Sequence, residues 1–122
     1  DYVISAYHQS KFLVLPSRWE LSPLTPLEGF ACKKTVISTT AHGIPYTITH
    51  DENCLLVPPS NSQKLADAIL ELLQNPSKCQ KLAESGFNMV NREGNLNSMS
   101  DSMFQVYEEI IQSKNNVLDE GF

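Results

Sequence analysis

The sequence has few cysteines and no long hydrophobic run. Its 122 residues include three cysteines, an odd number, and no Cys-x-x-Cys pair. This usage indicates neither a disulfide framework nor a zinc site, and it is typical of reduced thiols in a cytosolic protein. No segment approaches the roughly 20 apolar residues that a membrane-spanning helix needs, and the polar start of the sequence does not resemble a signal peptide. We therefore expect a cytoplasmic protein.

Basic residues are too few and too dispersed to indicate a polyanionic partner. Nine Lys and Arg stand against fourteen Asp and Glu, which gives a net charge of −5, and the longest basic run is Lys33-Lys34. Nucleic acids attract proteins through clustered Lys and Arg, so we expect no nucleic-acid partner. His8 and His50 have no carboxylate or cysteine at the spacing of metal ligands, so no metal site is expected either.

Short apolar runs alternate with helical patterns along the chain. The runs at residues 12–15, 35–38 and 55–57 predict strands. Helical patterns cover residues 26–33, 65–73, 82–90 and 96–111. A capping signal that begins at Ser60 precedes the second pattern, and Asn75-Pro76 marks the start of the third helix. This alternation predicts an α/β fold with a doubly wound parallel sheet that ends in α-helices.

The predicted domain extends over residues 1–113. Three strands are few for a doubly wound sheet, so we expect that further residues precede Asp1 in the natural protein and that this chain is the C-terminal part of a Rossmann-like domain. No helical pattern continues from Lys114, so residues 114–122 are expected to form a flexible tail.

Two glutamates with seven residues between them, Glu20 and Glu28, bracket a proline-rich turn. The turn follows the predicted strand at residues 12–15, and Thr25-Pro26 indicates the start of the next helix. Both carboxylates are therefore expected near the carboxyl end of a strand, which is the edge where open α/β sheets bind ligands.

Glu28 also has a purely structural interpretation. Thr25-Pro26-Leu27-Glu28 has the form of a capping box, in which the Glu28 carboxylate accepts a hydrogen bond from the N–H of Thr25. Position alone leaves both interpretations open. The partner Glu20 at a fixed spacing favours ligand binding.

A longer pattern surrounds the two glutamates. Its members are Pro16-Ser17, Glu20, Glu28, Ala31, Cys32, Lys34, Val36-Ile37, Gly43-Ile44-Pro45, Asn53 and residues 55–59. In these residues and their spacing, the chain resembles the C-terminal, nucleotide-sugar-binding domain of the group 1 glycosyltransferases. These are retaining enzymes of the GT-B fold, which has two facing Rossmann-like domains.

The resemblance implies a role for each residue of the turn. Glu28 would accept hydrogen bonds from the ribose of a nucleoside-diphosphate sugar, and Glu20 would be the catalytic carboxylate beside the donor sugar. Backbone N–H groups of Ser22, Leu24 and Thr25 would face the diphosphate, assisted by the positive end of the following helix. The implied reaction transfers the sugar with retention to a glycan, lipid or other acceptor, without a metal or cofactor.

The rest of the implied enzyme lies outside this chain. The acceptor would be held by a missing N-terminal domain, and the full-length protein could contact a membrane peripherally. The isolated fragment is expected to be inactive and, because its last helical pattern has an apolar stripe from Leu96 to Ile111, to self-associate.

One departure from the family pattern keeps other functions open. The family usually has Glu-Gly-Phe-Gly where this chain has Glu20-Leu21-Ser22-Pro23, so two permissive glycines are replaced. The new side chains restrict the backbone and reduce the space for a diphosphate that approaches it closely. A non-catalytic GT-B-like binding or interaction module is the alternative, and a nucleotide-sugar epimerase is a third hypothesis.

Overall fold

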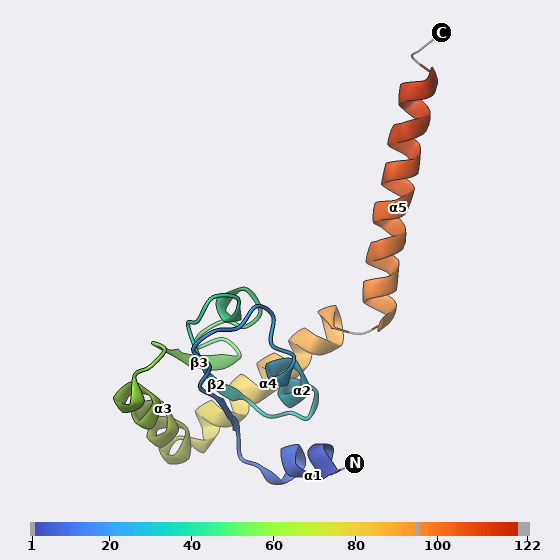
Figure 1. Cartoon of the computed structure of the whole chain (residues 1–122). Coiled ribbons are helices and arrows are strands. Elements are labelled where there is room, and N and C mark those ends of the chain that lie inside the picture. The colour runs from blue at the N-terminus through green and yellow to red at the C-terminus, as the bar shows by residue number, and fades with distance from the viewer. Residues whose placement is uncertain (1, 95, 120–122) are drawn as a thin grey trace. The chain divides into compact units, whose positions relative to one another are not determined.

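The computed structural model of this protein describes residues 2–94 and 96–119. Its sheet has the strands β1 (Leu13–Leu15), β2 (Val36–Thr39) and β3 (Cys54–Val57), which are parallel and lie in the order β1-β2-β3 (Figure 1). In the register, Val14 pairs with Ile37, and Ile37 pairs with Leu55. The predicted α/β class with a parallel sheet is confirmed, and each strand lies within one residue of its predicted range.

Helices precede, connect and follow the strands. They are α1 (Tyr2–Gln9), α2 (Thr25–Ala31), the short 3₁₀ helix η1 (Ile44–Tyr46), α3 (Ser62–Gln74), α4 (Pro76–Glu93) and α5 (Leu96–Asp119). The sequence pattern predicts no element in the segment that forms α1. The predicted α2 also differs, because the helix ends at Ala31 rather than at Lys33.

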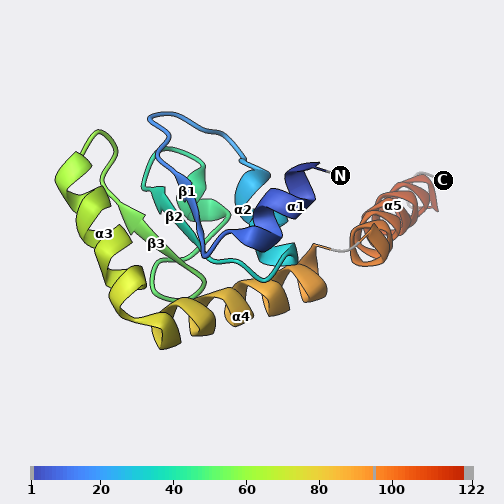
Figure 2. The same ribbon diagram turned by 90° about the horizontal axis from the view of Figure 1, so that it is seen from below.

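Both faces of the sheet are covered. Successive side chains of β2 point to opposite faces, so this strand contributes to the core on each side. On one face, Val36 packs with Phe30 of α2 and with Ile44 and Ile48 of the connection after β2. On the other face, Ile37 packs against apolar side chains of α3 and of the first half of α4, which are Ala68, Leu72 and Leu82. Figure 2 shows α2 and α3 on opposite sides of the sheet.

Helix α4 contributes to both cores. Its first half, through Leu82, packs on the face that α3 covers, whereas Met89 and Val90 pack on the face that α2 covers. Because α4 also lies beside Phe12 and Lys34, which precede β1 and β2, it crosses the amino ends of the strands. The carboxyl ends of the strands are therefore on the opposite edge from α4.

Asparagine side chains begin the two helices that follow β3. The Asn61 side chain accepts a hydrogen bond of 2.9 Å from the N–H of Lys64, and the Asn75 side chain accepts one of 3.1 Å from the N–H of Lys78. Such caps satisfy N–H groups that have no partner within the helix. The sequence predicts the first of these caps one residue early, at Ser60.

The chain divides into two compact units, residues 1–91 and 92–122. Within the second unit, α5 exposes several large apolar side chains, which are Met99, Met103, Phe104, Val106, Tyr107, Ile110 and Ile111. Helix α5 continues to Asp119, although the sequence pattern predicts that the helix ends before Lys114. The flexible tail, the domain extent of 1–113 and the self-association stay predictions, and residues 120–122 lie outside the described residues. Across residues 2–94 and 96–119, no helix has both the length and the apolar character that crossing a membrane requires.

Lys33 provides a test of backbone strain at the end of α2. Its φ of 57° lies in the left-handed region, which costs a side-chain-bearing residue about 1–2 kcal/mol. Its ammonium group lies 4.6 Å from the centroid of the Phe87 ring, and Lys33→Met removes this contact while it keeps the strain. We expect Lys33→Gly, which removes both, to be more stable than Lys33→Met by about 1 kcal/mol in urea unfolding. Equal stability of the two variants would show that the left-handed conformation is not strained.

Candidate functional site

The loop that carries Glu20 is attached to the end of the neighbouring strand. At the carboxyl edge of the sheet, Ser38 Oγ of β2 donates a hydrogen bond of 2.9 Å to the carbonyl of Leu15. Thr39 Oγ1 donates one of 2.7 Å to the carbonyl of Ser17. Ser38 and Thr39 are both buried, so these bonds are partly shielded from water. The segment after β1 therefore leaves the sheet in a fixed direction.

A backbone hydrogen bond from Gly43 is a second attachment of the loop that carries Glu20. Its N–H donates a hydrogen bond of 2.9 Å to the carbonyl of Glu20. A Cβ atom at position 43 would collide with the backbone carbonyl of Leu21. Only a glycine lets the loops after β1 and β2 approach this closely, so the backbone at Glu20 is held from two sides.

The Glu20 side chain is also held by a neighbour. Its Oε1 accepts a hydrogen bond of 3.1 Å from Ser17 Oγ, and the residue is half-buried. The Pro16-Ser17 pair of the sequence pattern thus has a physical role, because its hydroxyl orients the carboxylate four positions after the proline.

The Glu28 carboxylate makes a different contact from the one that a capping box requires. Helix α2 begins at Thr25, its N-cap residue is Leu24, and no side chain caps it. Glu28 Oε2 instead accepts a hydrogen bond of 2.7 Å from Tyr7 Oη of α1. The capping interpretation of Glu28 is therefore wrong. Because the carboxylate holds the phenolic proton, this bond raises the pKa of Tyr7 above its ordinary value.

The predicted diphosphate donors lie between the two carboxylates. In the part of the chain that the structure describes, the N–H groups of Ser22, Leu24 and Thr25 donate no hydrogen bond to the protein. Pro23 and Pro26 alternate with these residues, lack an N–H and are buried. The segment thus presents unpaired backbone donors and anchored carboxylates within residues 20–28, which suits a ligand that has both phosphate oxygens and hydroxyl groups.

Two rings lie beside Glu20. The centroids of the Trp19 and His42 rings are 6.0 Å apart, and their planes are tilted by 54°. Trp19 is 61% exposed, so it is not buried against the sheet. His42, in the loop after β2, has a φ of 42° and is exposed.

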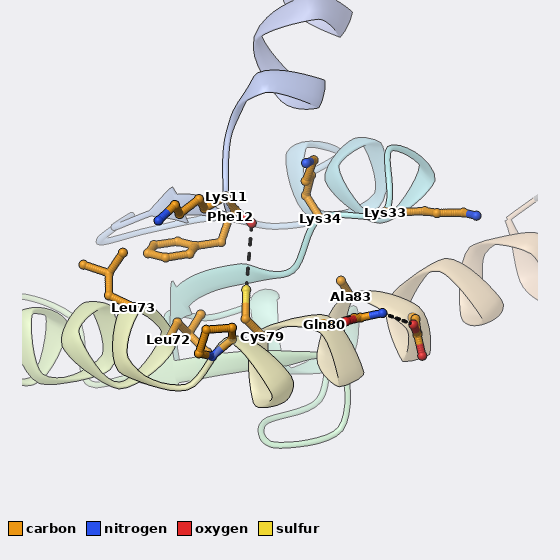
Figure 3. A pocket seen from close by; sticks show the side chains of 11 residues that line it. Lys11, Phe12, Lys33, Lys34, Leu72, Leu73, Cys79, Gln80 and Ala83 are labelled. Atoms are coloured by element: carbon orange, nitrogen blue, oxygen red, sulfur yellow. Dashed lines mark hydrogen bonds between the residues drawn. The ribbon is translucent and has the colours of Figure 1, made fainter.

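A cavity of about 400 Å³ lies at the opposite, amino edge of the strands (Figure 3). Its lining includes Lys11, Lys33 and Lys34, but the three ammonium groups point in different directions and do not converge on one ligand position (Figure 3). Cys79 lies at its centre, 3.8 Å from the carbonyl of Lys11, and burial raises the pKa of its thiol. Geometry therefore favours the carboxyl edge over this cavity as the candidate site.

Residues 2–94 and 96–119 contain no group of three or more His, Cys, Asp or Glu that could hold a metal ion. The chemistry available at residues 20–28 is that of carboxylate acceptors, hydroxyl donors and free backbone N–H groups.

Comparison of the sequence with known protein families identifies the family of this chain. Residues 1–89 match the family described as glycosyl transferases group 1. The chain belongs to this family. Its α/β fold is that of the C-terminal Rossmann-like domain of GT-B glycosyltransferases.

Individual proteins and solved structures that are similar to this chain are consistent with the family and the fold. An uncharacterized glycosyltransferase of Methanocaldococcus jannaschii is 39% identical over 75 residues, which are 62% of this chain and 21% of that protein. The sucrose-phosphate synthase of Thermosynechococcus elongatus has a TM-score of 0.82 and 29% identity, with 92% of this chain and 28% of the other covered. Anabaena HepE in complex with UDP has a TM-score of 0.80 and 18% identity, with 85% of this chain and 29% of the other covered. The chain thus spans about a fifth of the curated relative.

Sequence reasoning missed two residues of the site. Tyr7 was missed because no helix was predicted around it, although Val3, Ile4 and Tyr7 have the spacing of one helical face. Gly43 was matched to the family loop, but its contact with Leu21 could not be expected, because it joins segments more than 20 residues apart through the backbone.

Proposed function

We propose that this chain is the donor-binding part of a retaining glycosyltransferase. The full-length enzyme transfers a sugar from a nucleoside diphosphate to a glycan, lipid or other acceptor in the cytoplasm. The observation that carries this proposal is the pair of carboxylates, Glu20 and Glu28, each held by a hydroxyl group, on either side of backbone N–H groups without a protein partner. The complex of Anabaena HepE with UDP supports a nucleotide as part of the ligand.

Each group has a distinct role in the proposed complex. Glu28 accepts hydrogen bonds from ribose hydroxyls, because its second oxygen, Oε1, has no partner among the described residues. The N–H groups of Ser22, Leu24 and Thr25 face the diphosphate, whose negative charge grows as the sugar leaves. Glu20 lies beside the donor sugar, where its anchored carboxylate orients the sugar hydroxyls for the catalytic step.

The reaction proposed here uses no metal ion and no cofactor. A second domain, N-terminal to this chain, supplies the acceptor site, and basic residues upstream of Asp1 neutralise the leaving diphosphate. This chain alone is therefore expected to bind nucleotide weakly and to catalyse nothing.

Nucleotide titration with a Glu28 variant tests the proposal. We expect one of UDP, GDP and ADP to bind saturably to the full-length protein that carries this chain. Glu28→Gln removes the charge that strengthens the ribose hydrogen bonds, so it should weaken binding by about 10- to 100-fold, the equivalent of about 1.5–3 kcal/mol.

Glu52→Gln is the matched control, because Glu52 is exposed in the connection before β3 and its carboxylate makes no described contact. It should leave nucleotide affinity unchanged. Saturable binding whose affinity is unchanged by Glu28→Gln would show that Glu28 does not contact the nucleotide.

The non-catalytic module remains the second candidate, and one observation favours it. Leu21 is 70% exposed and Pro23 is buried at the positions where the family pattern has glycines, so side chains crowd the approach to the N–H groups. Absence of binding to all three nucleotides and to their sugar conjugates would favour this module over the enzyme.

A further inference from the structure

A hydrogen bond joins α1 to the candidate ribose-binding residue. Tyr7 Oη donates to Glu28 Oε2 at 2.7 Å, across 21 positions of sequence. Figure 2 shows α1 beside α2, the helix that carries Glu28. Tyr7 belongs to none of the groups to which a role in donor binding has been assigned above.

We propose that Tyr7 is a positioning residue for Glu28. It occupies Oε2 and holds the carboxylate in one orientation, so that Oε1 is presented to a hydroxyl of the nucleotide ribose. This inference rests on the proposed function, because it requires that Glu28 contact the ribose.

Glu28 needs such a partner because little else fixes it. The residue is exposed, and it forms no ion pair in the described part of the chain. A free glutamate side chain loses up to about 1.5–2 kcal/mol of rotamer entropy when a ligand immobilises it. A side chain that is already held in the absence of ligand avoids part of this cost.

A phenol is well suited to this role. It donates one hydrogen bond and carries no charge, so the carboxylate keeps its negative charge and Oε1 keeps its strength as an acceptor. A lysine or arginine in the same place would neutralise the carboxylate. The phenol is protonated at neutral pH at its ordinary pKa, and the bond to Glu28 raises the pKa of Tyr7 further.

Local hydrogen bonds close the end of α1 just after Tyr7, and a short segment then leads into the sheet. Ser10 Oγ donates a hydrogen bond of 2.8 Å to the carbonyl of Tyr7, and the N–H of Ser10 donates to the carbonyls of Ala6 and Tyr7 at 3.0 and 3.3 Å. Three residues later, the N–H of Leu13 donates to the carbonyl of Thr35, and β1 begins. A short connection thus links Tyr7 to the strand that precedes the loop of Glu20 and Glu28.

The test combines a side-chain change with a ligand change. Tyr7→Phe, Glu28→Gln and the control Tyr46→Phe, at a 93% exposed tyrosine, are made in the full-length protein that carries this chain. The probes are whichever of UDP, GDP and ADP binds, and its 2′,3′-dideoxy analogue. Affinities are measured by calorimetry, and urea unfolding checks that each variant is folded.

We expect Tyr7→Phe to weaken binding of the ribonucleotide by roughly three- to tenfold and to leave the affinity for the dideoxy analogue within about twofold. Tyr46→Phe should change neither affinity. A merely structural role for Tyr7 predicts equal losses for both probes, and this result would overturn the inference.

The remaining outcomes separate the two proposals. If Glu28→Gln weakens ribonucleotide binding and Tyr7→Phe does not, the inference fails and the proposed function stands. If no nucleotide binds, or if Glu28→Gln has no effect, the proposed donor site fails and the inference fails with it.

Discussion

Phe30→Ala is expected to lower the free energy of unfolding by about 3–5 kcal/mol, a large part of the about 5–15 kcal/mol that typical domains have. Phe30 is fully buried on the face of the sheet that α2 covers, where it packs with Val36 and Ile44. Truncation removes the apolar burial of a whole ring and leaves a cavity between the sheet and α4. Urea unfolding of the 122-residue chain, followed by circular dichroism, measures the loss.

Gly86 of α4 shows how closely Phe30 is packed. A Cβ atom at position 86 would collide with the Phe30 ring, so Gly86→Ala should cost about 1–3 kcal/mol. In a Phe30→Leu background, the same change should cost less, because leucine lacks the ring atoms that the Cβ would meet. A double-mutant cycle measures this coupling.

Leu21→Ala is the control for the truncation, since Leu21 is 70% exposed and should contribute less than about 0.5 kcal/mol. Additive effects of the Phe30 and Gly86 changes would contradict the packing described here.

Gly43→Ala is expected to disrupt the candidate site as well as the fold. The added Cβ would collide with the carbonyl of Leu21, which is backbone and cannot rotate away as a side chain can. Either the loop after β1 moves or the Gly43 N–H loses its bond to the carbonyl of Glu20. We expect a loss of stability of about 3 kcal/mol, at the upper end of the range for overpacking.

Gly29→Ala is the matched control for this change. Its Cβ would meet a terminal methyl of Leu13, which is the far end of a flexible side chain, and would lie 3.4 Å from a methyl of Val36. Alanine also has the higher helix propensity, by about 1 kcal/mol, so the two effects should nearly cancel. If Gly43→Ala were as mild as Gly29→Ala, the two loops would not be held together as described.

The elements that could be predicted are those with a local cause. The strands β2 and β3 are short apolar runs bounded by turn residues, and α3 has an apolar face at helical spacing, so the sequence predicts each of them close to its observed position. Helix α1 was missed because it buries none of its residues and has no strong cap signal. The end of α5 was also misjudged, because its last turns have no apolar pattern.

The candidate site also has parts with a local cause, which the sequence predicts, and parts that depend on distant segments. The spacing of Glu20 and Glu28 placed both carboxylates correctly after β1, because strand, turn and helix follow each other directly in sequence. Their hydrogen-bond partners were harder to predict. Ser17 is local and belonged to the recognised pattern, whereas Tyr7 reaches Glu28 from another helix.

By itself, the sequence determined the α/β class, the family and the segment that carries the candidate site, because periodicity, turn residues and motif spacing act over short distances along the chain. Only the tertiary structure decided what holds that segment. The partner of Glu28, the close contact of Gly43 with Leu21 and the exposure of Trp19 all depend on where segments distant in sequence meet. Tertiary packing determines these contacts, and no local sequence pattern predicts them.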